Sequence, residues 1–119
     1  MKKSNSVTIQ QQVSVPLHIE VVGSATDKGN GECWVNIGAR RLESASEKQG
    51  IIMFVCVIAS DTYVYQIPAS TLNSIFKEKN VTININRVKY DFRIEYKTGR
   101  LLRNNNKKEL IIDLISMSE

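Results

Sequence analysis

Three charged residues, Asp91, Glu95 and Lys97, have the types and spacing that metal-dependent phosphodiester cleavage uses. In such sites carboxylates hold Mg²⁺ through oxygen, and a lysine assists the attacking water. The tripeptide Glu95-Tyr96-Lys97 matches this acid-x-Lys pattern. The second carboxylate normally comes from a different strand, whereas Asp91 lies upstream on the same predicted strand. The pattern therefore indicates a charged sheet surface rather than an active metal site.

A second nuclease signal lies in the order of elements. The second half of the PD-(D/E)XK nuclease core is similar in order to one succession in this chain: ECWVNIG, helix, GIIMFVCVI, TYVYQIP, helix. That resemblance implies an acid-x-Lys motif on the strand before the first helix. The strand instead offers Cys33, Trp34, Val35 and Asn36. A degenerate or active nuclease of this type is kept as an alternative function.

Other catalytic groups are few. His18, the single histidine, lies in an apolar strand without an accompanying Ser or Cys motif, and it is interpreted as structural. Cys33 and Cys56 lie in predicted core strands and lack Cys-x-x-Cys spacing, which predicts buried free thiols in a reducing compartment. We therefore expect no catalytic residue, no metal and no cofactor.

Basic residues are concentrated in the last third of the chain. From Lys77 to Lys108 ten basic residues accompany three acidic ones, so this segment carries +7 against +4 for the whole chain. Such a concentration favours binding to a phosphate backbone, although Lys and Arg also protect exposed sheet edges. Within the segment, alternate positions are apolar and predicted to be buried: Val88, Tyr90, Phe92, Ile94 and Tyr96. Because the aromatic residues take the buried positions, duplex binding is favoured over stacking on single strands.

These residues belong to a predicted order of two strands, helix, two strands, helix, three strands. We expect strands over 13–23, 32–38, 51–58, 62–67 and 81–85, from Arg87 onward, and over 109–117. One helix is expected over 39–49, with Gly50 as its stop signal. The other is expected over 71–79, with Ser70 as its N-cap. Residues 1–12 form a polar arm and 13–119 a single domain. The fold class is mainly β with two short helices (α+β), a mostly antiparallel seven-stranded sheet curled into an open barrel.

This order resembles the B3-like pseudobarrels that recognise DNA in plant transcription factors and bacterial restriction endonucleases. The stretch YQIPASTLNSIF, a strand ending in Ile-Pro followed by a short helix, is similar to a segment of restriction-enzyme domains. The resemblance implies two arms that enter the major groove and read base edges with Arg, Lys and Asn. GSATDKGNG with GARR would form one arm, and the 97–108 region the other.

The sequence thus predicts a non-catalytic domain that binds double-stranded DNA. This domain would be the recognition module of a restriction endonuclease, and its second partner would be a nuclease domain or subunit. A protein-interaction domain that binds an acidic partner through its basic sheet face is another alternative. We expect a cytoplasmic protein without membrane contact, because no apolar signal stretch or span is present. The predicted DNA-binding residues are Lys28, Asn30, Arg40, Arg41, Lys89, Arg93, Lys97, Arg100, Arg103, Asn104, Asn105, Asn106, Lys107 and Lys108.

Overall fold

The structure, a computed structural model, describes residues 18–24, 31–81, 83–84, 88–104 and 107–117. The described residues form an α+β fold, as the sequence predicts, with eight strands rather than seven. In chain order the elements are β1 (Ile19–Ser24), β2 (Glu32–Gly38), α1 (Ala39–Glu47), β3 (Ile51–Ile58), β4 (Asp61–Pro68), α2 (Ala69–Glu78), β5 (Ile83–Asn84), β6 (Lys89–Glu95), β7 (Arg100–Arg103), β8 (Leu110–Asp113) and α3 (Leu114–Met117).

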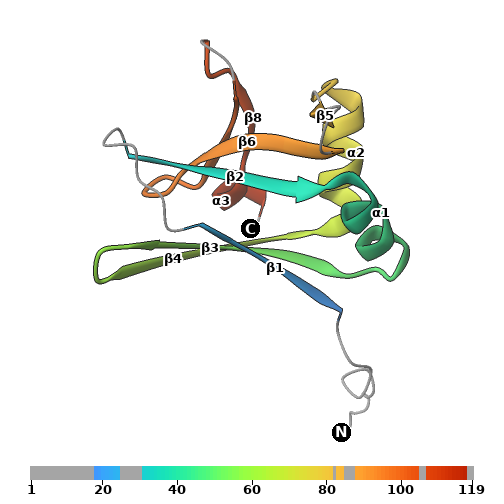
Figure 1. Cartoon of the computed structure of the whole chain (residues 1–119), viewed down its shortest axis with the longest axis horizontal. Helices are drawn as coiled ribbons and strands as arrows, with labels where there is room; N and C mark the ends of the chain where they lie inside the picture. The colour runs from blue at the N-terminus through green and yellow to red at the C-terminus, as the bar shows by residue number, and fades with distance from the viewer. Residues whose placement is uncertain (1–17, 25–30, 82, 85–87, 105–106, 118–119) are drawn as a thin grey trace, which may run out of the picture.

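The described strands form two sheets that do not join into a closed barrel (Figure 1). In the three-stranded sheet, β3 lies between β1, which is parallel to it, and β4, which is antiparallel. The other sheet has the antiparallel order β2-β6-β7-β8, with β5 paired to β6. Helices α1 and α2 pack against each other at one end of the two sheets. The predicted order, with a helix after the second strand and another after the fourth, is confirmed.

The core lies between the sheets and is built from alternate residues of each strand. Phe92 of β6 contacts Phe54 of β3 edge-on, with ring centroids 5.7 Å apart, and Phe76 of α2 at 5.3 Å. All three rings are almost completely buried. One aromatic cluster therefore joins both sheets and a helix. The helices add residues spaced three and four apart, as expected for an apolar helix face: Leu42 and Ala45 of α1, and Ala69, Leu72 and Phe76 of α2.

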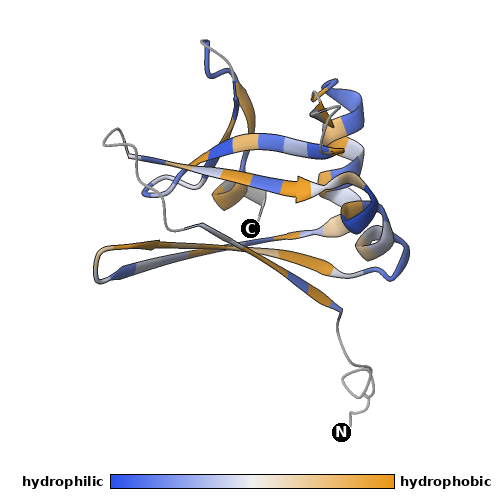
Figure 2. Cartoon of the chain, in the orientation of Figure 1, coloured by the Kyte–Doolittle hydropathy of each residue, from blue (hydrophilic) through white to orange (hydrophobic). Residues whose placement is uncertain are grey.

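The outer face of the three-stranded sheet carries no charged side chain in the described strands. Hydrophobic stretches on β1 and β3 are visible in Figure 2. Ile19, Val21, Val57 and Val64 are between 43% and 53% exposed. An apolar sheet face of this kind is typical of surfaces that contact other proteins. The register places these residues on one face: Ile19, Val21, Gly23, Ile51, Met53, Val55, Val57, Thr62, Val64, Gln66 and Pro68.

The junctions between strands and helices differ from the prediction. Pro68, not Ser70, is the N-cap of α2, and no side chain caps this end. The reason is that β4 runs directly into the helix, whose first amide, at Ala69, donates to the Gly50 carbonyl at 2.9 Å. The prediction that Ser70 caps the helix was therefore wrong, since Ser70 lies inside the first turn.

Gly50 follows α1 for a different reason than the expected helix stop. The helix ends at Glu47, and Gln49 is the residue with left-handed backbone, at φ 57°. A Cβ at Gly50 would lie 2.6 Å from the His18 carbonyl oxygen, which is closer than real contacts. Gly50 is required because the chain passes tightly against the start of β1.

Two further predictions are corrected in the last third of the chain. Val88 is 54% exposed and has a left-handed φ of 51°, so it does not continue the buried alternation. Tyr90, Phe92, Ile94 and Tyr96 are buried as predicted.

The last strand also stops early, because Asp113 turns the chain into α3. Its carboxylate accepts the Ile115 amide at 3.1 Å, and the Leu114 amide donates to the Gly99 carbonyl. Residues 114–117 are therefore helical rather than extended. Across the ranges described above, no helix has the length and apolar character needed to cross a membrane.

Candidate nucleic-acid interface

Charged side chains project from the outer face of the five-stranded sheet. On β6 they alternate with the buried residues, so that Lys89, Asp91, Arg93 and Glu95 share this face. The antiparallel register places Trp34 of β2 opposite Arg93. Strand β6, in the basic segment on which the nucleic-acid hypothesis is based, therefore presents its charged side outward, as predicted.

Arg93 is held in place by acidic and amide groups of other strands. Its guanidinium lies 3.2 Å from the Glu32 carboxylate and donates to the Asn104 side-chain oxygen at 3.0 Å. Glu32 is only 5% exposed, and its second oxygen lies 3.4 Å from the Lys108 ammonium. A buried carboxylate needs such cationic partners, because water no longer solvates it. Arg93 and Lys108, both predicted DNA contacts, thus neutralise a charge of the protein itself.

Trp34 lies on the same face, and its exposure was missed by the sequence analysis. The Arg93 guanidinium carbon is 5.1 Å from the centre of the indole ring, which is 48% exposed. The alternation in ECWVNIG indicates this exposure. Cys33, Val35 and Ile37 are buried, and the residues between them in a strand point to the opposite face. The predicted burial of aromatic residues concerned only the segment around Phe92, where it is confirmed, so the sequence analysis left this exposed ring on β2 out of account.

A shallow cavity lies beside this tryptophan. It has a volume of about 180 Å³. Its floor includes Val35 and Phe92, whose side chains point into the core. Among the described residues, Trp34, Asn36, Asp91 and Asn104 also line it, and Asn104 is a predicted DNA contact. The cavity therefore combines one aromatic surface with amide and carboxylate groups.

Arg103 binds the end of a helix. Its guanidinium donates to the carbonyl oxygens of Lys79 and Asn80, directly after α2, and lies 3.5 Å from the Glu109 carboxylate. Carbonyls at a helix C-terminus lack partners within the helix, so a cation there stabilises it. The guanidinium of Arg103 is therefore already bound by carbonyl and carboxylate groups of the protein itself.

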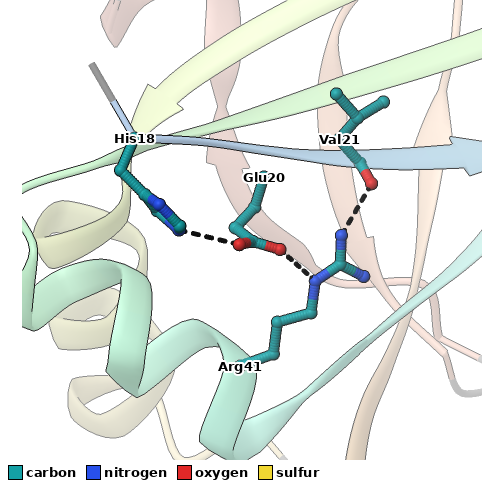
Figure 3. Close-up of polar contacts among 4 residues, drawn as sticks. All are labelled: His18, Glu20, Val21 and Arg41. Atoms are coloured by element: carbon teal, nitrogen blue, oxygen red, sulfur yellow. Dashed lines mark hydrogen bonds and ion pairs between the residues drawn. The ribbon is translucent and has the colours of Figure 1, made fainter. Parts of the chain in front are cut away.

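Arg41 fastens α1 to β1 (Figure 3). Its guanidinium donates to the Glu20 carboxylate and, at 2.8 Å, to the Val21 carbonyl. His18 contacts the other oxygen of Glu20 at 2.7 Å. The hydrogen bond from Arg41 is the main cause that lowers the pKa of Glu20 below its usual 4.5, while partial burial opposes it. His18 and Arg41 therefore both contribute to a contact between a strand and a helix.

This contact predicts a pH-dependent contribution to stability. Because the folded state lowers the pKa of Glu20, the stabilisation is complete above the usual value of 4.5 and is lost as the pH falls through the lowered value. We expect Glu20→Gln to reduce the free energy of unfolding by about 0.5–1 kcal/mol at pH 7 and by almost nothing at pH 2. Urea unfolding at both pH values measures it, with the exposed Glu47→Gln as control. An equal loss at both pH values would contradict the ionic origin.

The remaining predicted cations have different surroundings. Within the part of the chain that the structure describes, no ion pair involves these five side chains, and all but the half-buried Lys89 are exposed: Arg40, Lys89, Lys97, Arg100 and Lys107. Four other predicted contacts, Lys28, Asn30, Asn105 and Asn106, lie outside the described residues. The predicted site therefore divides into cations used within the fold and cations available to a partner.

The charge concentration predicted from the sequence is reduced by folding. The count of +7 over Lys77–Lys108 did not include Glu32 and Glu109, which the fold brings against Arg93, Lys108 and Arg103. Sheet pairing also places Arg100 opposite Glu95. The outer face of the sheet is thus a mixture of both signs, and its unpaired cations lie toward the turns.

The nuclease-like tripeptide does not form a compact acidic site. Asp91 and Glu95 lie four residues apart on one strand, which corresponds to about 13 Å. Tyr96 is buried, and the Thr98 hydroxyl donates to the Glu95 carboxylate within the turn. Among the described residues, no three His, Cys, Asp or Glu side chains lie close enough together to hold a metal ion.

The prediction that the two cysteines are buried free thiols is confirmed. Desolvation, with a smaller contribution from the neighbouring Cys33, raises the pKa of Cys56 to about 12. A thiol with so high a pKa is a poor nucleophile at neutral pH.

Comparisons with protein-family models, with curated proteins and with solved structures found no match to this chain. The side chains described above and their geometry are therefore the basis for its function.

Proposed function

We propose that this domain binds double-stranded DNA without catalysing a reaction on it. The observation that carries the proposal is that five of the predicted DNA-binding cations form no ion pair among the described residues: Arg40, Lys89, Lys97, Arg100 and Lys107. A lysine or arginine that is not neutralised by the protein can displace counterions from a phosphate backbone. The net charge of +4 acts in the same direction over longer distances.

We further propose that the fold is a variant of the B3-like pseudobarrel, with the two sheets forming its open wall. The element order supports this, because α1 follows the second strand and α2 follows the fourth. The domain would then be the recognition module of a restriction endonuclease, acting with a separate nuclease domain or subunit. Of the region proposed as the second arm, Lys97, Arg100 and Lys107 are the unpaired cations.

The proposal predicts steeply salt-dependent binding. Each phosphate contact contributes about −0.9 to the slope of log affinity against log salt, so most of the five cations together give a slope of about −4. Arg100→Ala should weaken binding and reduce this slope by about 1. Fluorescence anisotropy with a labelled duplex, from low to physiological salt, measures both. Lys48→Ala, which removes an exposed lysine at the end of α1, is the matched control.

Further arms of the assay address the alternatives. Affinity that does not change with salt would contradict duplex binding through these cations. Equal or tighter binding to polyglutamate would favour an acidic protein partner. Incubation with plasmid and Mg²⁺ should leave the DNA intact, and nicking that Glu95→Ala abolishes would favour a nuclease. Arg103→Ala serves as an internal contrast, because its effect should appear in the stability of the fold, through the end of α2, before it appears in affinity.

A further inference from the structure

The cavity on the outer face of the five-stranded sheet has an aromatic wall. Trp34 is half exposed, and the Arg93 guanidinium lies 5.1 Å from the centre of its ring. Arg93 is itself fixed by the buried Glu32 and by Asn104. The exposed part of the ring offers a stacking surface, and the contact with Arg93 favours one conformation of the tryptophan, which reduces the side-chain entropy lost when a ligand stacks on it.

The rest of the cavity lining supplies hydrogen-bonding groups of both kinds. Within the described structure the side chain of Asn36 makes no hydrogen bond, so both its amide nitrogen, a donor, and its amide oxygen, an acceptor, are available. Asn104 gives its side-chain oxygen to Arg93, which leaves its amide nitrogen as a donor. Asp91 adds carboxylate oxygens to the lining. A matching ligand therefore has a flat aromatic face and an edge that both donates and accepts.

A nucleobase has this chemistry. The volume of about 180 Å³ is similar to that of an engineered cavity of about 150 Å³ that binds benzene, so the cavity has room for one planar ring. In a duplex the flat faces of a base are covered by its neighbours, whereas an unpaired base exposes both its faces and its hydrogen-bonding edge. The cavity therefore suits a base that is not paired.

We propose that this cavity binds one unpaired nucleobase, stacked on Trp34 and hydrogen-bonded by Asn36 and Asn104. The inference rests on the proposed nucleic-acid binding in one respect, because the base would arrive on a strand whose phosphates contact nearby cations. Lys89 begins the strand that carries Asp91, and Lys107 lies in the same β7–β8 connection as Asn104. A free nucleoside would offer the same ring without the phosphates.

Trp34 is the only tryptophan in the chain, so its fluorescence reports on the cavity directly. The probes are a twelve-nucleotide thymidine strand, an adenine strand of the same length, the duplex formed from the two, and free adenosine. The single strands should quench Trp34 emission, and the duplex should quench it far less. Adenosine should quench it only at much higher concentration. Quenching by adenosine at the same concentration as the strand would identify a free nucleoside as the ligand.

Variants test the contribution of each wall. Replacing Trp34 by Leu should weaken single-strand binding, measured by anisotropy, about 5- to 150-fold, and Trp34→Phe should restore part of the affinity. Asn36→Ala keeps the fluorophore and should shift the quenching curve to higher concentration. Gln66→Ala removes an exposed amide from the outer face of the other sheet and should change neither curve.

The two proposals fail separately. No change in Trp34 emission with any single strand or nucleoside, while labelled duplex still binds, would overturn the cavity inference and leave duplex binding standing. Quenching by adenosine without any duplex binding would overturn the proposed function and leave the cavity standing. Unchanged single-strand affinity in Trp34→Leu would also overturn the stacking role.

Discussion

Phe92→Ala should lower the free energy of unfolding by about 4 kcal/mol. The ring is 1% exposed and contacts Phe54 of the opposite sheet and Phe76 of α2. Its truncation removes buried apolar surface, leaves a cavity where both sheets and a helix meet, and breaks two aromatic pairs. Because a domain of this size has a total stability of about 5–15 kcal/mol, the variant should be close to unfolding at 37 °C.

Chemical denaturation followed by circular dichroism measures this change. Phe92→Leu retains most of the buried volume and should lose only about 1–1.5 kcal/mol, which keeps the prediction testable if the alanine variant does not fold. Val64→Ala, on the exposed face of β4, is the surface control and should lose less than either. A loss in Phe92→Ala no larger than that of the control would mean that the aromatic cluster does not join the sheets.

The apolar alternation that buries Phe92 could be predicted from the sequence because it is local. Residues two apart on a strand share a face, so IIMFVCVI and KYDFRIE show which side chains enter the core. The glycine of KTGR marks the turn between β6 and β7 in the same local way, and the φ of 80° at Gly99 explains why the residue is glycine. Element order followed from the same local signals.

Contacts between distant residues could not be predicted in the same way. The partner of Arg93 lies 61 residues away at Glu32, so a count of charges along one segment misses it. Arg103 acquires its role because the end of β7 lies beside the end of α2. The end of β8 depends on a hydrogen bond from Leu114 to Gly99, which the apolar run ELIIDLISM does not reveal. The exposure of Trp34, in contrast, was available from the alternation of β2.

These distant contacts change which substitutions report on binding. Arg93 and Lys89 are equivalent in the sequence, as two cations on the outer side of one strand. In the structure, Arg93 neutralises a buried carboxylate, while Lys89 forms no ion pair within the described residues. A loss of DNA affinity in an Arg93 variant would therefore combine binding with stability, so Arg100 and Lys107 are the better probes of phosphate contact.

Arg93→Ala should therefore destabilise the fold by about 3 kcal/mol, although the residue lies on the outer face of the sheet. Its removal deprives Glu32, which is 5% exposed, of the guanidinium at 3.2 Å, while the Lys108 ammonium at 3.4 Å remains. An uncompensated buried charge costs about 3–5 kcal/mol, and Lys108 at 3.4 Å offsets part of that cost. Lys89→Ala, on the same strand and face, should cost less than about 0.5 kcal/mol.

A double-mutant cycle identifies the buried carboxylate as the cause. If the destabilisation arises from Glu32, the additional change Glu32→Gln should restore part of the stability lost in Arg93→Ala, because it removes the charge that needs a partner. Arg93→Lys should retain part of the stability, since it keeps the charge but loses the planar group that also contacts Trp34 and Asn104. Urea unfolding at pH 7 gives the four values of the cycle, for the wild type, Arg93→Ala, Glu32→Gln and the double variant, and the value for Arg93→Lys. If Arg93→Ala and Lys89→Ala both lowered the free energy of unfolding by the same small amount, the ion pair between Arg93 and Glu32 would not stabilise the fold. Arg93 would then be available to contact phosphate, like Lys89.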